Sequence, residues 1–407
     1  MNQPTVNRSK ETAPDDRQRE SVTADDPGFV VPGWMHWLGG WIHRKPQTWI
    51  RLGNLETRAV SDAIADIRVD RPVYVSGLAR SGTTILLEHL AANPAVATHR
   101  YIDFPPLMTP YWWNRWLARV PKSGEKAQER AHKDGIEVTS QSPEAFEEML
   151  WMAFFPATHD PATSSVMGRQ AEHSAFARFY DEHVRKLLAV RKRSRYVAKG
   201  NYNLVRLGYL HARYPDARFL LVIRDPIWHI ASLMKQQKLF VAGEISEPRA
   251  LEHMRRVGHY EFGLDRRAIN VGNDEETRRI TKLWEAGAQG DRASEIEGWA
   301  RYWAAIYAHV ADTLDADSAL RESALIVRYE ELCGQPLDTL GGIFAHADLE
   351  IDAPTLEAAA GDLHAPTYYR PDFSDEELAM IAEITGPTAQ RFGYGRHIDS
   401  GGPPGTR

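Results

Sequence analysis

A glycine-rich loop between a predicted strand and a predicted helix constrains the fold of this chain more than any other feature. The loop lies within residues 73–90, which read VYVSGLARSGTTILLEHL. The run VYVS is typical of a strand and ends at Gly77, whereas Leu86 and Leu90 recur at helical spacing before Pro94 marks the end of the helix. The stretch therefore predicts a strand, a glycine loop and a helix in direct succession.

Two further strands are predicted downstream. The segment RFLLVI, residues 218–223, is a continuous apolar run of the kind found in parallel strands that are buried on both faces, and helical patterns flank it. The segment ALIVRYEEL, residues 324–332, predicts a third strand and precedes the helical pattern LDTLGGIFAHA. Strands that alternate with helices predict an α/β fold with a doubly wound parallel sheet of the P-loop type, flanked by helices.

Length and composition bound the domain organisation. A chain of 407 residues with 43% hydrophobic side chains suffices for one large α/β domain or two smaller ones, and we expect a single domain over residues 29–396. Large helical insertions at about residues 104–195 and 235–310 are predicted to cover the carboxyl edge of the sheet, where ligands of open α/β sheets bind. Residues 1–28 are predicted to be a disordered tail and residues 397–407 a flexible one.

Charge and cysteine content exclude several classes of protein. The 49 lysines and arginines against 55 aspartates and glutamates give a net charge of −6, so a nucleic-acid partner is not expected. Cys333 is the single cysteine, which excludes an intrachain disulfide and a cysteine metal cluster and favours a reducing compartment. The sequence has neither the pattern of a signal peptide nor an apolar run of about 18 residues that would form a transmembrane segment. We therefore expect a cytoplasmic protein.

The glycine loop itself predicts an anion site. Its glycines keep the G-x-x-x-x-G spacing of loops that bind nucleoside triphosphates, but Thr83 stands where such a loop carries its lysine. Backbone N–H groups converge at such a turn, and the side chains available there are Arg80, Ser81, Thr83 and Thr84. These donors fit a phosphate ester without an obligatory metal better than they fit ATP. The alternative is a turn that merely joins the strand to the helix.

A second anion site is predicted after the strand at residues 218–223. Arg224 follows that strand, and Ser232 lies eight residues later, about two turns along the next helix. Both side chains can therefore reach one anion, although an ion pair of Arg224 with Asp225 is a competing interpretation. Two anion sites at neighbouring strand ends indicate a nucleotide that is phosphorylated at both its 5′ and its 3′ position.

At these motifs the sequence resembles bacterial sulfotransferases that use 3′-phosphoadenosine 5′-phosphosulfate (PAPS). The segment GLARSGTT is similar to their 5′-phosphosulfate loop, G-x-P-R-S-G-T-T, with Ala79 in place of the proline. The segment FLLVIRDPIWHIAS is similar to their 3′-phosphate motif, and VRYEEL is similar to the segment near the adenine. The resemblance implies that PAPS is bound by Arg80, Ser81, Gly82, Thr83, Thr84, Arg224, Ser232 and Tyr329.

The resemblance also implies the reaction, which is transfer of a sulfuryl group from PAPS to a hydroxyl or amine of an acceptor, with no metal required. Lys199 matches the lysine of a bacterial segment that typically reads K-S-P-x-H, and its ammonium is expected to stabilise the leaving oxygen or the sulfuryl oxygens. Gly200, Asn201 and Asn203 depart from that pattern. The alternative for Lys199 is an exposed lysine after a strand.

The general base is the least defined part of this mechanism. Related enzymes often use a glutamate or a histidine, in several cases about twenty residues after the loop, but here that window reads THRYIDFPPLM without a glutamate. Asp103 is our first candidate, because its position between two apolar residues favours partial desolvation and a raised pKa, and His99 is the second. Further candidates are Glu147, Glu148 and His159, and each of the five has the alternative of a cap, an ion-pair partner or a surface residue.

Aromatic segments supply the only information about the acceptor. Residues 104–117 and 146–156 suit an apolar small molecule or a lipid, but ordinary core packing explains the same pattern. The tryptophan-rich segment 34–49 either packs a first helix onto the body or makes a peripheral contact with a membrane or an apolar substrate. Residues 258–272 either line the acceptor site or form an oligomer contact, and the sequence does not predict an oligomeric state.

Two other functions compete with this interpretation. A P-loop kinase or phosphotransferase would need magnesium ligands and a lysine that reaches the phosphates, and Thr83 at the position of that lysine argues against it. A non-catalytic nucleotide-binding scaffold would keep the fold and the nucleotide site without turnover.

Overall fold

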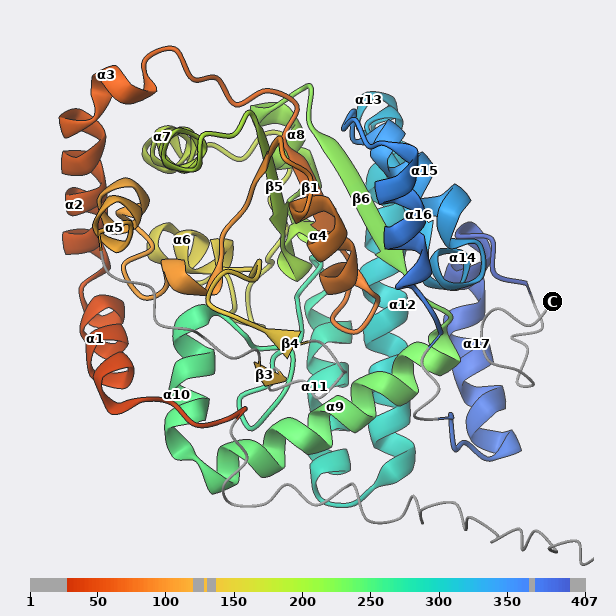
Figure 1. The fold of residues 1–407 in the computed structure, drawn as a ribbon. Coiled ribbons are helices and arrows are strands. Elements are labelled where there is room, and N and C mark those ends of the chain that lie inside the picture. The colour runs from red at the N-terminus through yellow and green to blue at the C-terminus, as the bar shows by residue number, and fades with distance from the viewer. Residues whose placement is uncertain (1–27, 120–127, 130–136, 366–369, 396–407) are drawn as a thin grey trace, which may run out of the picture.

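Five parallel strands form the central sheet of the computed structural model, which describes residues 28–119, 128–129, 137–365 and 370–395. In order across the sheet, the strands are β2 (Val96–Ala97), β5 (Arg195–Lys199), β1 (Val73–Ser76), β6 (Arg218–Ile223) and β7 (Ala324–Arg328). Helices cover both faces of this sheet (Figure 1), so the prediction of a doubly wound parallel sheet is confirmed. The predicted tails lie outside the described residues, apart from residue 28.

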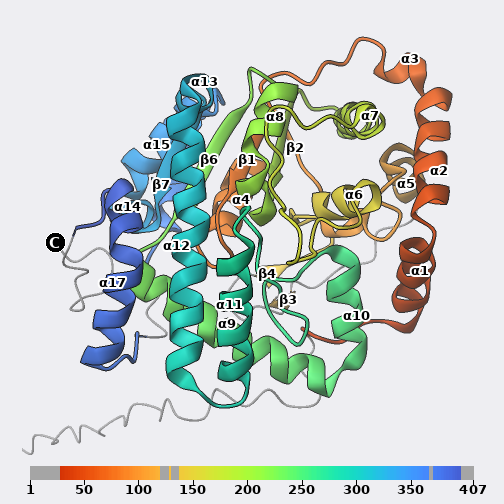
Figure 2. The ribbon, with the colours of Figure 1, turned by 180° about the vertical axis from the view of Figure 1, so that it is seen from behind.

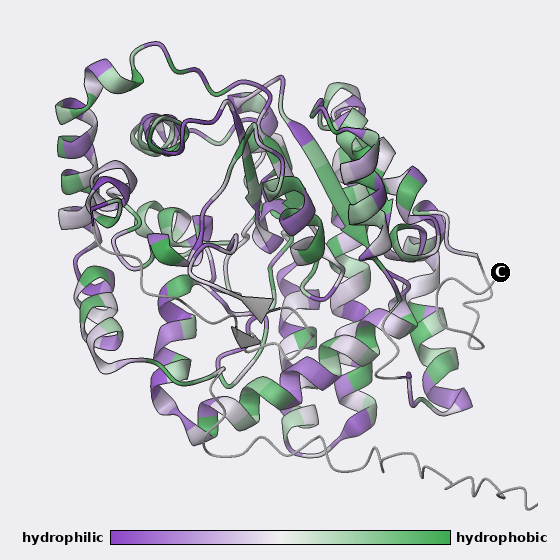
Figure 3. Ribbon diagram, viewed as in Figure 1, coloured by the Kyte–Doolittle hydropathy of each residue, from purple (hydrophilic) through white to green (hydrophobic). Residues whose placement is uncertain are grey.

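The register of the strands places their carboxyl ends at one edge of the sheet. Val73 of β1 lies opposite Val197 of β5 and Arg218 of β6, and Leu220 of β6 lies opposite Leu325 of β7. Figure 3 shows β6 as hydrophobic over almost its whole length. Such a continuous apolar run is expected of a parallel strand that is covered by helices on both faces.

One face of the sheet packs against α4 (Thr83–Ala91) and α15 (Pro336–His346). Val75 and Val222 point into this core, where they meet Leu86 of α4 and Phe344 of α15. On the same side, α14 (Tyr329–Gly334) joins β7 to α15, and α16 (Ala353–Gly361) packs on α15.

The opposite face packs against α7 (Ser174–Arg191), α8 (Leu207–Arg213) and α12 (Arg292–Ala316), which Figure 2 shows from behind. Alternate strand residues point into this second core, where Tyr74 stacks on Phe219 and its hydroxyl lies 3.3 Å from the hydroxyl of Tyr180. The helices that pack against α12 are α9 (Pro226–Ser246), α11 (Asp274–Ala288), α13 (Ser318–Glu322) and α17 (Asp375–Arg391).

The predicted insertions divide between two places. Beside the sheet lie, from these insertions, α5 (Pro110–Leu117), the two-stranded sheet β3 (Gln128–Glu129) and β4 (Glu137–Val138), α6 (Glu147–Phe154) and α10 (Pro248–Val257). The elements α1 (Gly33–Arg44), α2 (Pro46–Ala59), α3 (Ser61–Ile64), η2 (Tyr101–Asp103) and η3 (Asn201–Val205), which fall outside the predicted insertions, lie there as well. In contrast, α7 and α12, which fall wholly and mostly within the predicted insertions, bury long apolar stripes on a face of the sheet rather than over its carboxyl edge. None of the helices in the described ranges is long and apolar enough to cross a membrane.

Candidate active site

The glycine loop joins β1 to α4, and its backbone takes conformations that favour glycine. Gly82 precedes α4 with a φ of +105°, and Arg80 has a φ of +72°. A Cβ atom at Gly82 would lie 2.6 Å from Cδ2 of Tyr329, and one at Gly77 would lie 2.5 Å from the carbonyl oxygen of Val222. The loop therefore packs directly on β6 and on the residue that follows β7.

Arg224 and Ser232 lie beside this loop. Nη1 of Arg224 donates to the carbonyl oxygen of Arg80 at 3.3 Å, and Nε of Arg80 donates to Oγ of Ser232 at 3.3 Å. Both Arg224 and Ser232 are 3% exposed, and the guanidinium carbon of Arg224 lies 4.5 Å from the ring centroid of Tyr329. The structure thus brings four residues of the predicted nucleotide site together where three adjacent strands end.

His229 of α9, which the sequence analysis did not single out, forms a hydrogen bond with the loop. Its Nε2 donates to the carbonyl oxygen of Ala79 at 2.8 Å, and its Nδ1 accepts from the indole of Trp303 at 3.2 Å. Burial lowers the pKa of His229 to about 3, so the ring is neutral and keeps its proton on Nε2. A signal was present in the sequence, because His229 lies three residues before Ser232 and therefore on a similar side of the same helix.

Tyr307 of α12 is a second support for the loop that the sequence analysis missed. Its hydroxyl accepts from the backbone N–H of Leu78 at 3.3 Å and donates to the carbonyl oxygen of Val222 at 3.0 Å. Burial raises the pKa of Tyr307, so the hydroxyl keeps the proton that it donates. No local pattern points to this contact, since Leu78 and Tyr307 are 229 positions apart.

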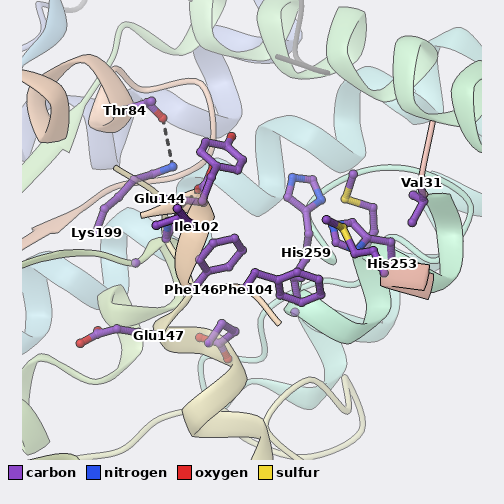
Figure 4. A pocket seen from close by; sticks show the side chains of 18 of the residues that line it. Val31, Thr84, Ile102, Phe104, Glu144, Phe146, Glu147, Lys199, His253 and His259 are labelled. Carbon is purple, nitrogen blue, oxygen red and sulfur yellow. Dashed lines mark hydrogen bonds between the residues drawn. The ribbon is translucent and has the colours of Figure 1, made fainter. Parts of the chain in front are cut away.

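Lys199 reaches the loop from the neighbouring strand. It is the last residue of β5, and its Nζ donates to Oγ1 of Thr84 at 3.0 Å (Figure 4). Thr83, which precedes this threonine at the start of α4, is 3% exposed. The loop has no lysine of its own, and the structure supplies one from β5.

A cavity of about 990 Å³ reaches the loop at this pair. Its polar end is formed by Arg80, Thr83, Thr84 and Lys199, and Figure 4 shows aromatic side chains farther along. Its apolar walls include Val31, Ile102, Phe104, Trp113, Phe146 and Met254. Arg224, Ser232 and Tyr329 are not among the described residues that line it, so the cavity meets the loop from a different side than the second anion site does.

The aromatic segments of the sequence both line the cavity and pack the core. Phe104 and Phe146 stack with ring centroids 5.7 Å apart and line the cavity. Trp151, from the same run as Phe146, is fully buried in the core against α7. His259 and Glu261 also line the cavity, so residues 258–272 contribute to its wall.

The structure does not place Asp103 or His99 among the residues that line the cavity. Asp103 is 1% exposed, and its carboxylate accepts from the Arg100 backbone N–H at 2.8 Å. The same carboxylate accepts from Asn114 at 3.0 Å and from the guanidinium of Arg191 at 2.6 Å. Burial alone would raise the pKa of Asp103, but the nearby His99, whose Nδ1 lies 3.8 Å from the carboxylate, and the charge of Arg191 hold it well below its usual range. The expected raised pKa of Asp103 is therefore wrong, because its neighbours stabilise the charged form.

The further base candidates are held in buried networks. Glu147 accepts hydrogen bonds from two buried tyrosine hydroxyls, one on α7 and one on β5 at 2.6 Å, and burial raises its pKa. In Figure 4 its carboxylate points away from the phenylalanine rings of the cavity. Glu148 is 2.7 Å from both Arg206 and Nε2 of His159, and although burial opposes it, the charge of Arg206 lowers its pKa to about 2. Both glutamates border the cavity, but these contacts engage the carboxylate of Glu148 and one carboxylate oxygen of Glu147.

Glu144 is a cavity residue that the sequence analysis did not consider. It is half-buried, and Figure 4 places it on the same side of the cavity as Lys199 and Thr84, with His253 and His259 across from them. The backbone N–H of Glu144 donates to the carbonyl oxygen of His99 at 2.9 Å. This pairing brings Glu144 beside the segment in which the sequence suggested the base.

Within the described ranges, no three histidine, cysteine, aspartate or glutamate side chains are grouped so that they could hold a metal ion.

Comparison with known proteins shows a family model that matches the part of the chain that carries this site. Residues 72–268 match the model of the sulfotransferase family, and this range contains the loop, Lys199, Arg224 and Ser232. No curated protein matches the chain.

Several solved structures are similar to the chain. One is the sulfotransferase STF1 from Mycobacterium tuberculosis H37Rv, with 16% identity over 90% of this chain and 99% of that one and a TM-score of 0.41. Another is the sulfotransferase STF9 from Mycobacterium avium, with 16% identity over 82% and 81% of the two chains and a TM-score of 0.39. A sulfotransferase from Alicyclobacillus acidocaldarius has 14% identity over 80% and 95% and a TM-score of 0.39.

Proposed function

We propose that the chain, whose residues 72–268 match the model of the sulfotransferase family, transfers a sulfuryl group from PAPS to a hydroxyl or amine of an apolar acceptor. One observation carries this proposal. Arg80, Arg224, Ser232 and Tyr329 converge at the carboxyl ends of β1, β6 and β7, which are adjacent in the sheet. Two neighbouring groups of anion-binding side chains beside an aromatic ring suit a nucleotide with a phosphate at each end of its ribose.

We assign the parts of PAPS to these groups. The loop, with its backbone N–H groups at the start of α4 and the hydroxyls of Thr83 and Thr84, is assigned to the 5′-phosphosulfate. Arg224 and Ser232 are assigned to the 3′-phosphate. Tyr329 is assigned to the adenine side, and the close approach of its ring to Gly82 leaves no room for a side chain at that position.

The proposed reaction is a direct displacement at sulfur. The acceptor oxygen or nitrogen forms a bond to sulfur while the bond between sulfur and the bridging phosphate oxygen breaks. The electron pair of the broken bond stays on that oxygen, so 3′-phosphoadenosine 5′-phosphate (PAP) leaves, and the acceptor loses its proton to a base. We assign Lys199, which already donates to Thr84, and the loop N–H groups to stabilising the growing negative charge.

We assign the base to Glu144 rather than to Asp103 or His99. A general base must come within hydrogen-bonding distance of the proton that it removes, and Glu144 lines the cavity on the side of Lys199. The carboxylate of Asp103 is occupied by three donors and stays charged because Arg191 is paired with it. A carboxylate in that setting has little affinity for the proton of an acceptor.

The cavity supports an acceptor with an apolar body. Its volume of about 990 Å³ is at the upper end of the usual range for small-molecule sites. Its walls are mostly aromatic and aliphatic, and Arg80, Thr83, Thr84 and Lys199 lie where it meets the loop. A lipid or other apolar molecule with one hydroxyl or amine group would place that group at the loop.

Thermal stabilisation by PAP tests the nucleotide assignment. We expect PAP at a hundred times its dissociation constant to stabilise the chain by about 2.7 kcal/mol, and ATP with magnesium to stabilise it less. Arg224→Ala should weaken PAP binding by about 10-fold to 100-fold, because a charged hydrogen bond contributes about 1.5–3 kcal/mol. Arg218→Ala, at the opposite end of the same strand, is the matched control and should bind PAP normally.

The same measurements separate the competing functions. A preference for ATP with magnesium would favour a kinase or phosphotransferase, and full PAP binding by Arg224→Ala would refute the assignment of the 3′-phosphate. Turnover separates an enzyme from a scaffold. If no label moves from radiolabelled PAPS into the acceptor pool of a cell extract while PAP still binds, the chain is a nucleotide-binding scaffold.

A further inference from the structure

Six of the ten large apolar side chains that are exposed in the described part of the chain lie on α1, α2 and α5. We call this surface the tryptophan face, and it consists of Trp34, Trp37, Trp41, Leu55, Trp112 and Trp116. The three tryptophans of α1 are 59%, 68% and 40% exposed, and their spacing of three and four residues puts them on one side of the helix. Exposed apolar clusters of this kind mark sites of interaction.

The tryptophan face is one surface rather than a set of scattered residues. Both views show α1, α2 and α5 on the same side of the molecule (Figures 1 and 2). The backbone N–H of Trp112 on α5 donates to Glu56 of α2 at 2.6 Å, and Trp41 of α1 packs edge-on against Trp49 of α2 at 5.3 Å. Trp49 itself is only 8% exposed. The tryptophan-rich segment thus anchors one indole in the body and exposes three.

The charge of these helices is opposite in sign to that of the whole chain. The exposed charged side chains on α1, α2 and α5 are Arg44, Arg51, Arg58 and Arg115, and all are basic. The single acidic residue of the three helices, Glu56, is fully buried and lies 2.9 Å from the ammonium of Lys186. Three helices that carry tryptophans and arginines without an exposed carboxylate of their own, on a chain with a net charge of −6, are complementary to an anionic apolar layer.

The cavity opens on the tryptophan face. Trp34 and Trp116 line the cavity and are also 59% and 51% exposed, so each belongs to both the wall and the outer surface. Met35, Trp113 and Leu117 continue the wall inward from the same two helices. A molecule that enters between α1 and α5 therefore meets apolar side chains from the surface inward.

We propose that the tryptophan face docks on an anionic phospholipid bilayer. Indole rings are stable at the boundary between headgroups and acyl chains, and the arginines contact the acidic headgroups. In this orientation the mouth of the cavity faces the bilayer, which is where an amphiphilic acceptor would be found. Only this last point rests on the proposed sulfuryl transfer, since docking itself does not require it.

Vesicle sedimentation tests the docking. We expect the full chain to pellet with vesicles of phosphatidylcholine and phosphatidylserine, to pellet less with phosphatidylcholine alone, and to be released as salt rises. A triple variant with Trp37, Trp41 and Trp112 each changed to serine should lower the partition coefficient by at least about tenfold. None of these three residues lines the cavity, so PAP binding should stay normal and would report that the variant is folded.

A matched variant controls for exposed apolar area. Ile245, Leu264 and Leu337 are 66%, 51% and 45% exposed and lie outside the tryptophan face, so their change to serine should leave vesicle binding intact. Equal losses in the two triple variants would overturn the proposal. So would absence of the wild-type chain from every vesicle pellet. A dimer in solution that the tryptophan variant alone dissociates, without vesicle binding, would instead assign this face to a second copy of the chain.

Discussion

Replacing Glu144 by glutamine and, in parallel, Asp103 by asparagine separates a base from a structural carboxylate. Both substitutions remove one negative charge and keep nearly the same shape. Glu144→Gln should lower kcat by about 10²–10⁴-fold, the usual contribution of a general base. Because Glu144 is half-buried at the cavity wall, its free energy of unfolding should change by about 0.5 kcal/mol or less.

Asp103→Asn should have the opposite effect. The carboxylate of Asp103 is 1% exposed, and its partner Arg191, 2.6 Å away, has a side chain that is only 7% exposed. Removing one member of a buried ion pair costs about 3–5 kcal/mol. With an unfolding entropy of about 2.1 cal/mol/K per residue, a chain of 407 residues loses about 1 °C per kcal/mol, so the melting temperature should fall by about 4–6 °C. The folded variant should keep its turnover.

Two assays on the same preparations decide between these roles. Transfer of label from radiolabelled PAPS gives kcat, and thermal unfolding with and without PAP gives stability and nucleotide binding. PAP should stabilise Glu144→Gln as much as it stabilises the wild type. Our reasoning is wrong if Asp103→Asn loses turnover at an unchanged melting temperature, or if Glu144→Gln retains full turnover.

Two further predictions concern the nucleotide site. Gly82→Ala should weaken PAP binding by at least about tenfold in calorimetric titration, because the new Cβ would lie 2.6 Å from the ring of Tyr329 at a φ of +105°. Gly386→Ala, where a Cβ meets nothing within 4 Å, is the control and should have no effect on PAP binding. Equal affinities of the two variants for PAP would contradict the close packing of the loop. Burial and the charge of Glu330 raise the pKa of Asp225 to about 7 from 3.8. The folded chain therefore binds the Asp225 proton more tightly than the unfolded chain does, and this contribution to the free energy of unfolding is full below about pH 4. The contribution, of the order of 4 kcal/mol, is lost as the pH rises through 7. Asp225→Asn, which still caps α9, should remove this loss of stability, and urea unfolding of the variant and the wild type between pH 4 and 8 measures the difference. Identical dependence of stability on pH in the two proteins would refute the prediction.

The convergence of the loop with Arg224 and Ser232, to which we assign the nucleotide, could be predicted from the sequence because its parts are local. The loop, its strand and its helix are consecutive, and Arg224 and Ser232 lie on one strand end and the helix that follows it. The spacing of residues within one strand–loop–helix unit fixes where their side chains lie. The convergence of the two units then follows from the parallel sheet, whose strands all end at one edge.

Glu144, which we propose as the base, could not be predicted in this way, because its position depends on pairing between distant segments. The backbone N–H of Ile102 donates to Ser140 at 2.8 Å, and that of Glu144 donates to His99 at 2.9 Å. These contacts bring a glutamate from far along the chain to the cavity. Asp103 is turned instead toward Arg191, 88 positions away. The spacing of residues along the sequence predicts neither the contact of Glu144 with His99 nor that of Asp103 with Arg191. It also does not predict the contact of Tyr307 with the loop.

The placement of Arg224, Ser232 and Tyr329 away from the cavity has a kinetic consequence for the proposed reaction. These side chains are assigned to the half of the nucleotide that the reaction leaves unchanged. Departure of the sulfuryl group would therefore remove few of the contacts that hold the donor, and PAP would leave slowly. Under this assignment, release of the spent nucleotide rather than bond breaking sets the rate of successive turnovers, and accumulated PAP competes strongly with fresh PAPS.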